Sequence, residues 1–296
     1  MDPLVSRLEE DTRRRRRRAL FKYRQVPVRM LIPNFFTLVG LCAGLTAIRM
    51  AIEGRYELAL AAIVFAALLD GVDGRVARLL KASSRFGAEF DSLADFVNFG
   101  VAPAIVLFTW GEWATPGMRG LAWIVVLLLA VACGLRLARF NAVLDVEKPK
   151  WQSNYFSGVP APAGAIIALL PVYLDQLGVL EMRTGWPIYF VLAYALLVAF
   201  LMVSTIPTYS GKLLGERISR EWVMPLFVLA GAVIALLVTY PYATLTVGTL
   251  LYIALIPLSV RRYYSQLRTM EAEAQRAPPA VPTLVMEPPR SDRAQR

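Results

Sequence analysis

Long apolar runs, separated by short polar segments, fill most of the chain between residues 31 and 265. Several runs approach 20 residues, and a helix of that length crosses the hydrocarbon core of a bilayer. The last two runs are separated only by Tyr240, Pro241 and Tyr242, so they fit either two spans or one broken, re-entrant pair. The pattern predicts an all-α fold, a polytopic membrane helix bundle of about eight transmembrane helices. The predicted spans cover approximately residues 32–52, 57–80, 89–110, 120–140, 160–180, 187–207, 222–240 and 243–260.

The composition agrees with a membrane protein and removes several kinds of chemistry. Hydrophobic residues make up 57% of the 296 residues and charged residues 18%, whereas soluble proteins carry about 25% charged residues. The chain has no histidine, which excludes histidine-ligated zinc and a histidine general base. Cys42 and Cys133 lie in apolar runs and are expected to be small buried side chains, since two cysteines are too few for a disulfide framework.

Lysine and arginine are distributed unevenly between the two sides of the predicted bundle. If the N-terminus lies inside the cell, the loops on the outer side hold only Arg55, Arg119 and Arg183. An excess of Lys and Arg marks cytoplasmic segments, so both termini are expected in the cytoplasm. The segments placed on that side are 1–31, 81–88, 141–159, 208–221 and the C-terminal tail.

Three regions follow from this pattern. Residues 1–30 form a basic cytoplasmic N-terminal segment, in which Arg13 to Arg18 is an unbroken run. Such a run fits a nucleic-acid-binding arm, but an anchor beside anionic lipid is the simpler account, so no nucleic-acid partner is expected. Residues 31–265 form the transmembrane domain, and the polar, Pro-rich residues 266–296 are predicted to be a disordered cytoplasmic tail.

Four aspartates stand where the second predicted span ends and the third begins, in LLDGVDGRVARLLKASSRFGAEFDSLADFVNFG at 68–100. On a helix, Asp70 and Asp73 share one face, and so do Asp91 and Asp95. The loop between them is short, so the two helices are neighbours and all four carboxylates can converge. A carboxylate inside a span costs about 2.5–3.5 kcal/mol, which divalent cations would offset. Oxygen ligands alone indicate Mg²⁺ or Mn²⁺, and four carboxylates suit two ions.

The other residues of the segment 68–100 suit the binding of an anion. Gly71, Gly74 and Gly87 leave the backbone open to close approach. Arg78 follows Gly74 by one turn, and it is either a counter-ion for the aspartates or a clamp on a phosphate that the ions also hold. Metal, phosphate and arginine together fit phosphoryl-type transfer. Because intramembrane aspartates also line ion pathways, a divalent-cation transporter stays open as an alternative of another class, as does a non-catalytic membrane scaffold.

Eight positions follow the pattern D-x2-D-G-x2-A-R-x8-G-x3-D-x3-D, which resembles the signature of the CDP-alcohol phosphotransferase family. In that family an alcohol attacks a CDP-linked lipid, CMP leaves and a phosphodiester forms. The resemblance covers roughly residues 28 to 265, and it implies that the protein is a membrane enzyme. The matching residues are Asp70, Asp73, Gly74, Ala77, Arg78, Gly87, Asp91 and Asp95.

The resemblance also implies roles for these residues. Asp70, Asp73 and Asp91 would bind metal, while Asp95 would complete the second metal site and take the proton of the attacking hydroxyl. The CDP-lipid would be contacted by Gly74, Arg78 and Ser84, with Ala77 and Gly87 allowing close packing around it. Asn34, in IPNFFT, resembles a further nucleotide contact, and a helix cap is its alternative reading.

Three later segments, GLRLARFN at 134–141, NYFSGVPAPAGA at 154–165 and LMVSTIPTYSGK at 201–212, resemble the branch of the family that uses L-serine. This implies transfer from CDP-diacylglycerol to L-serine, giving phosphatidylserine and CMP. Arg136 and Arg139 share a helix face that suits the serine carboxylate, although they also fit cytoplasmic anchors, and Asn141 would cap the helix or contact substrate. Choline, glycerol 3-phosphate and inositol phosphate are the alternative acceptors.

Assembly and location are further expectations. The family resemblance implies a homodimer, which the sequence supports through small-residue helix faces such as Gly40-x-x-x-Gly44. Relatives often carry a second Asn where this chain has Gly40, so no side-chain contact is expected from that position. The protein is expected to be integral to the cell (inner) membrane, among membrane lipids, with its active site facing the cytoplasm and lipid tails entering between helices.

Overall fold

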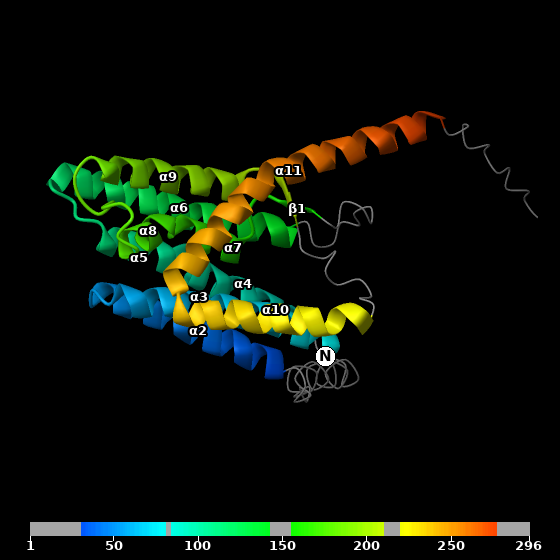
Figure 1. Ribbon diagram of the computed structural model, residues 1–296, viewed down its shortest axis with the longest axis horizontal. Coiled ribbons are helices and arrows are strands. Elements are labelled where there is room, and N and C mark those ends of the chain that lie inside the picture. Colours follow the sequence, from blue (N-terminus) through cyan, green and yellow to red (C-terminus); the bar gives the residue numbers. More distant parts are fainter. Residues whose placement is uncertain (1–30, 81–83, 143–154, 210–219, 277–296) are drawn as a thin grey trace, which may run out of the picture.

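The computed structural model describes residues 31–80, 84–142, 155–209 and 220–276. Helices hold most of these residues, and two short strands join them (Figure 1). The helices are α2 (Leu31–Ile52), α3 (Tyr56–Leu79), α4 (Arg85–Asp95), the π-helix η2 (Phe96–Val101), α5 (Ala102–Trp110), α6 (Pro116–Ala142), α7 (Ala161–Ala168), α8 (Leu170–Gln176), α9 (Pro187–Val203), α10 (Arg220–Thr239) and α11 (Pro241–Arg276). The strands are β1 (Tyr155–Ser157) and β2 (Pro207–Tyr209).

Every predicted span overlaps a helix or consecutive helices, so the prediction of a mostly helical membrane protein is confirmed. Within the described ranges, five helices are long and apolar enough to cross a bilayer. One of them, Arg85–Trp110, combines α4, η2 and α5, whereas α7 to α8 and α9 are shorter apolar helices. The five are Leu31–Ile52, Arg85–Trp110, Pro116–Ala142, Glu221–Thr239 and Pro241–Met270.

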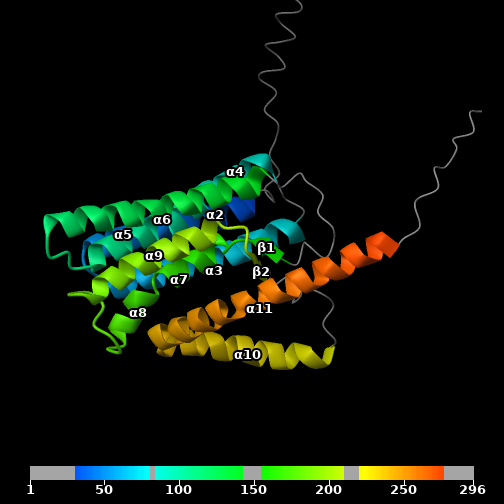
Figure 2. The same cartoon turned by 90° about the horizontal axis from the view of Figure 1, so that it is seen from above.

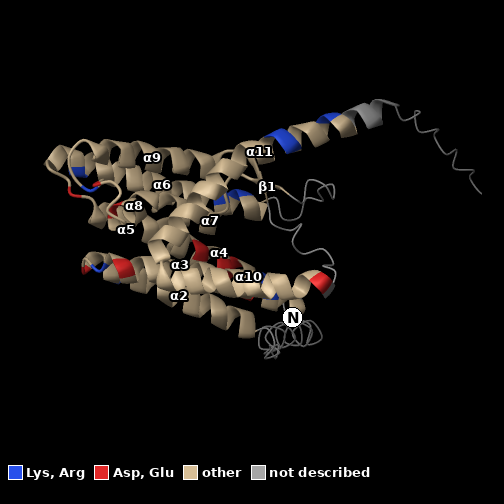
Figure 3. Cartoon of the chain, in the orientation of Figure 1, with Lys and Arg blue, Asp and Glu red and all other residues tan. Residues whose placement is uncertain are grey.

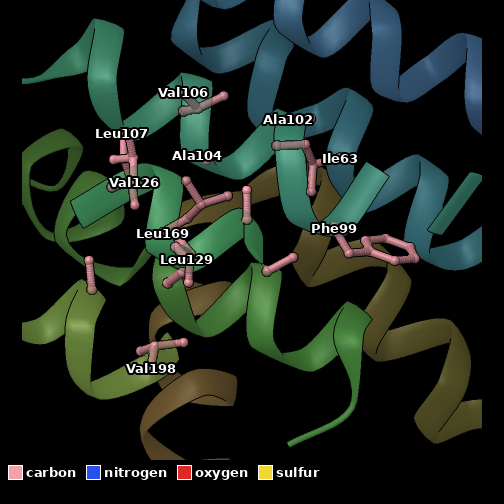
Figure 4. Packing of buried hydrophobic residues seen from close by; sticks show 14 of the residues in the cluster. Ile63, Phe99, Ala102, Ala104, Val106, Leu107, Val126, Leu129, Leu169 and Val198 are labelled. Carbon is pink, nitrogen blue, oxygen red and sulfur yellow. The ribbon is translucent and has the colours of Figure 1, made fainter. Parts of the chain in front are cut away.

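The buried core lies where α2, α3, α5, α6, α7 and α9 meet (Figure 4). Large side chains such as Ile63, Phe99 and Leu129 fill it, and small ones such as Ala47 and Ala59 let the helices approach closely. Helix α10 stands outside this core, since none of its span is buried, and it runs beside the first half of α11 (Figure 2). Helix α11 packs against the body, with Tyr252, Ile253 and Ile256 on the core, so α10 is the peripheral helix of the bundle.

The strands β1 and β2 form a two-stranded antiparallel ribbon that the all-α prediction missed. Tyr155 pairs with Tyr209, and Ser157 pairs with Pro207. The sixth span was predicted to reach residue 207, but α9 ends at Val203 and the chain turns into β2. Proline has no amide hydrogen to continue a helix, which explains why this apolar segment leaves the helical conformation before Pro207.

Two further expectations need correction. The tail was predicted to begin at residue 266, but α11 continues to Arg276, and residues 277–296 lie outside the described ranges. The segment RRYYSQLRTMEAEAQR lacks Gly and Pro and is rich in helix-forming residues, so polarity alone does not end the helix. Cys133 is buried as predicted, whereas Cys42 is exposed on α2, because an apolar residue in a membrane protein is equally suited to face lipid.

Candidate active site

The four aspartates lie on α3 and α4, and Figure 3 shows the acidic positions of these two helices inside the bundle. Carboxylate oxygens of Asp70, Asp91 and Asp95 all lie within 4.8 Å of one another. Asp70 and Asp95 are close enough for a side-chain hydrogen bond. The predicted convergence is therefore confirmed for three carboxylates that come from two helices.

Asp73 is held separately from that group of three. Its side chain is buried, at 5% exposure, and its Oδ2 accepts a hydrogen bond from Thr37 Oγ1 on α2 at 2.9 Å. The carboxylate still interacts electrostatically with Asp70 and Asp91. The sequence prediction did not include Thr37. The one feature of the sequence that points to this residue is its position one turn after Asn34 in IPNFFT.

A pocket of about 190 Å³ opens between α2, α3 and α4 beside Asp73 and Asp91. It brings together five of the six residues predicted to bind the CDP-lipid. The sixth, Arg78, is on α3, but its side chain lies outside the described part of the chain. The lining residues are Pro33, Asn34, Thr37, Asp73, Gly74, Ala77, Ser84, Gly87, Ala88 and Asp91.

The start of α4 forms one wall of this pocket. Ser84 is the N-cap of α4, and its Oγ accepts a hydrogen bond from the backbone N–H of Gly87 at 3.0 Å. A Cβ atom at Gly87 would lie 2.8 Å from Asn34 Oδ1, so glycine is required for this close approach. Asn34 itself lies inside α2, which begins at Leu31, so the alternative reading as a helix cap is wrong.

The three residues predicted to bind serine lie near the end of α6 but have different surroundings. Arg136 is buried, interacts electrostatically with Asp95 and Asp70, and stacks its guanidinium 5.6 Å from the centre of the Phe140 ring. Asn141 Nδ2 donates to Ser92 Oγ at 2.9 Å, which ties α6 to α4. Arg136, and not Asn141, is the residue that interacts with the carboxylates. A contact of Arg136 or of Asn141 with serine stays a prediction.

Arg139 is engaged with backbone groups. Its guanidinium donates to the carbonyl oxygens of Ser157 and Ser204 at 3.0 Å each, and to that of Val203. These contacts join α6 to β1 and to the end of α9, where helix carbonyls lack partners within the helix. The visible role of Arg139 is therefore structural, and its predicted contact with serine stays a prediction.

Directly after Asp95 the chain forms the π-helix η2, which the sequence did not reveal. Single π turns are rare and occur frequently at functional sites. Asn98 in η2 is 3% exposed and lies against α2, where a Cβ at Gly44 would come within 2.0 Å of Asn98 Oδ1. Gly40 also faces Asn98. The Gly40-x-x-x-Gly44 pattern thus serves packing inside the protomer, which removes it as support for a homodimer.

The donor atoms of the site fit a hard divalent cation. Asp70, Asp91 and Asp95 offer only carboxylate oxygens, the ligands that Mg²⁺ and Mn²⁺ prefer. Three carboxylates at this separation repel one another unless positive charge or protons lie between them. A pocket beside such a cluster, on helices apolar enough to cross a bilayer, is suited to a divalent cation next to an anionic ligand.

The comparisons with known proteins define the class further. Residues 30–206 match the CDP-alcohol phosphatidyltransferase family, and residues 221–257 match CDP-alcohol phosphatidyltransferase 2. The chain belongs to the CDP-alcohol phosphatidyltransferase family.

Several relatives carry the name CDP-diacylglycerol–serine O-phosphatidyltransferase. The protein of Mycobacterium tuberculosis is 41% identical over 236 residues, which cover 78% of this chain and 78% of the relative. The protein of Helicobacter pylori is 35% identical over 224 residues, covering 75% and 88% of the two chains. The protein of Methanocaldococcus jannaschii is 33% identical over 196 residues, covering 66% and 81%.

Proposed function

We propose that this protein transfers the phosphatidyl group of CDP-diacylglycerol to the hydroxyl of L-serine and releases CMP, giving phosphatidylserine. One observation carries the proposal: the acidic signature of the family forms a cluster of Asp70, Asp91 and Asp95 beside a pocket that Asp73 and Asp91 line, in a chain whose relatives are named for this reaction. Family members generally depend on a divalent metal, and the acidic cluster matches that requirement.

The metal would be held by Asp70, Asp91 and Asp95, with Asp73 on the nucleotide side, and we infer Mg²⁺ or Mn²⁺, in two ions. Bound cations would neutralise the diphosphate and the leaving CMP. Asn34 and Ser84, with the open backbone at Gly74 and Gly87, would receive the CDP moiety, because they line the pocket beside Asp73. Arg78 would contact a phosphate, as the family signature implies.

Asp95 is the proposed general base. The serine hydroxyl oxygen forms a bond to the phosphorus of the phosphatidyl group, while the bond from that phosphorus to the CMP oxygen breaks. The hydroxyl proton passes to the Asp95 carboxylate, and the electron pair of the broken bond leaves with CMP. Asp95 suits this role because its carboxylate is one of the three that lie within 4.8 Å of one another and it also interacts electrostatically with Arg136. The Arg136 guanidinium would bind the serine carboxylate from that side.

The remaining proposals concern placement. We infer eight spans, cytoplasmic termini and an active site at the cytoplasmic face of the cell (inner) membrane, supported by the few basic residues of the outer loops, Arg55, Arg119 and Arg183. Membrane lipids would surround the helices, whose outward side chains are largely apolar. A homodimer is expected from the family resemblance alone.

An acceptor panel tests the proposed reaction. Purified protein in nanodiscs receives CDP-diacylglycerol labelled in the lipid, with Mn²⁺ and one of serine, choline, glycerol 3-phosphate or inositol phosphate. We expect labelled phosphatidylserine and stoichiometric CMP with serine only, and loss of both on adding EDTA or in Asp95→Asn, with a fall of at least about 100-fold. Label transfer to another acceptor but not to serine would defeat the serine assignment. Mn²⁺ flux into proteoliposomes that contain the protein, without CMP release, would favour a transporter.

A further inference from the structure

The four carboxylates are divided into a cluster of three and one that is held apart. Asp70, Asp91 and Asp95 have oxygens within 4.8 Å of one another, whereas Asp73 is hydrogen-bonded to Thr37. Building on the proposed function, we propose that Thr37 is a positioning residue for metal binding. It fixes the Asp73 carboxylate at the border between the metal cluster and the nucleotide pocket.

The contact has the geometry of a specific interaction. Thr37 Oγ1 lies 2.9 Å from Asp73 Oδ2, and the two residues are 7% and 5% exposed. They belong to different helices, α2 and α3, and both line the pocket that also contains Asn34 and Asp91. A hydrogen bond to a charged group that is shielded from water is stronger than a neutral one, so it can hold the carboxylate in one orientation.

The contact is not needed to satisfy the threonine. Thr37 Oγ1 also lies 3.2 Å from the carbonyl oxygen of Pro33 in its own helix, a partner that any helical threonine can use. The group that gains from the bond is Asp73, whose carboxylate is surrounded by like charges. Asp73 also accepts a hydrogen bond from the backbone of Gly74, so Thr37 is one of two contacts that fix its carboxylate beside the cluster and the pocket. Outer partners of this kind typically change metal affinity by about 10–100-fold when removed.

The test compares three substitutions on the same helix. Thr37→Val keeps the shape and removes the hydroxyl, Thr37→Ser keeps the hydroxyl, and Thr46→Val makes the same change at an exposed site where Thr46 Oγ1 bonds only within α2. Mn²⁺ binding is measured by electron paramagnetic resonance on protein in nanodiscs with CDP present, and CMP release is titrated with Mn²⁺.

We expect Thr37→Val to raise the dissociation constant for Mn²⁺ and the half-saturating Mn²⁺ concentration about tenfold, with kcat at saturating Mn²⁺ within about threefold of the parent. Thr37→Ser and Thr46→Val should match the parent. If Thr37→Val does not fold, Thr37→Ala is measured in its place with the same expectation.

Mn²⁺ affinity unchanged in Thr37→Val, or in Thr37→Ala where that variant replaces it, would overturn the inference, as would an equal weakening in Thr46→Val. The binding measurement also separates this inference from the proposed function. Weaker Mn²⁺ binding in Thr37→Val, in a protein that makes no phosphatidylserine, would defeat only the proposed function. Parental Mn²⁺ binding in Thr37→Val, in a protein that does make phosphatidylserine, would defeat only the role of Thr37.

Discussion

At the residue scale, single side chains decide how closely the helices approach each other around the carboxylates. Asn98 follows Asp95 by one turn, and its side-chain amide packs against the backbone of α2 at Gly44. Its Oδ1 has no hydrogen-bond partner in the described part of the chain, so the contact is one of shape rather than of paired polar groups. Gly44 therefore sets the position of η2 and, with it, the direction of Asp95.

This packing gives a prediction for two glycines one turn apart. Gly44→Ala would place a Cβ 2.0 Å from Asn98 Oδ1, and we expect the free energy of unfolding to fall by about 1–3 kcal/mol. Gly40→Ala is the matched control, because its Cβ would lie 3.6 Å from Asn98 Nδ2, an ordinary contact. Thermal unfolding in detergent should show destabilisation for Gly44→Ala but not for Gly40→Ala. The double variant Gly44→Ala/Asn98→Ala should lose less stability than the sum of the losses in Gly44→Ala and Asn98→Ala. Equal stability of the two glycine variants would contradict this packing.

The sequence revealed the site residues that follow a local pattern and missed those defined by tertiary contacts. Asp70, Asp91 and Asp95 were predictable because helical spacing and a short loop bring them together. Thr37 and Asn98 were not, since the first meets a partner 36 residues later and the second meets α2 across the bundle. Threonine and asparagine in apolar spans have no spacing rule that reveals such partners.

At the element scale, the β1–β2 ribbon links three parts of the chain near the end of α6. Arg139 joins the ribbon to α9 through backbone carbonyls, while Tyr155 stacks on Tyr209 and meets Tyr263 of α11 edge-on, with ring centres 5.7 and 5.2 Å apart. The Tyr155 hydroxyl also donates to Gln266 Oε1. These contacts hold the part of α11 around Tyr263 and Gln266 against the ribbon. Hydrophobic run length predicted the helices well, but three-residue strands leave no periodic signal.

Substitution of Arg139 tests whether it supports the ribbon. We expect Arg139→Gln to lower the free energy of unfolding by about 1–2 kcal/mol, because it loses charge-assisted hydrogen bonds to three carbonyls. Arg49→Gln is the control, since the Arg49 side chain is 73% exposed and its surface pair with Glu53 contributes less than about 1 kcal/mol. Thermal unfolding and the KM for serine are measured together. Parental stability combined with a raised KM would show that Arg139 binds serine instead.

At the scale of the whole molecule, the fold places polar chemistry at one end of an apolar bundle. Helices α3, α4 and α6 bring the aspartates and Arg136 together, and the ribbon contacts α6 one turn further on, at Arg139. The charge pattern of the loops predicts this shared location, because it places the segments that carry these residues on the same side of the membrane. The outlying position of α10 was not predictable, since a lipid-facing helix and a buried helix are equally apolar.

The central claim is that paired acidic residues of α3 and α4 hold hard cations against a CDP-linked diphosphate. The most direct measurement is a crystal structure of the protein with CDP-diacylglycerol and Mn²⁺, using anomalous scattering to locate the ions. We predict anomalous peaks among Asp70, Asp91 and Asp95, with the nucleotide in the pocket between Asn34 and Gly87. Nucleotide bound elsewhere, or an acidic cluster without an anomalous peak at saturating Mn²⁺, would contradict the account.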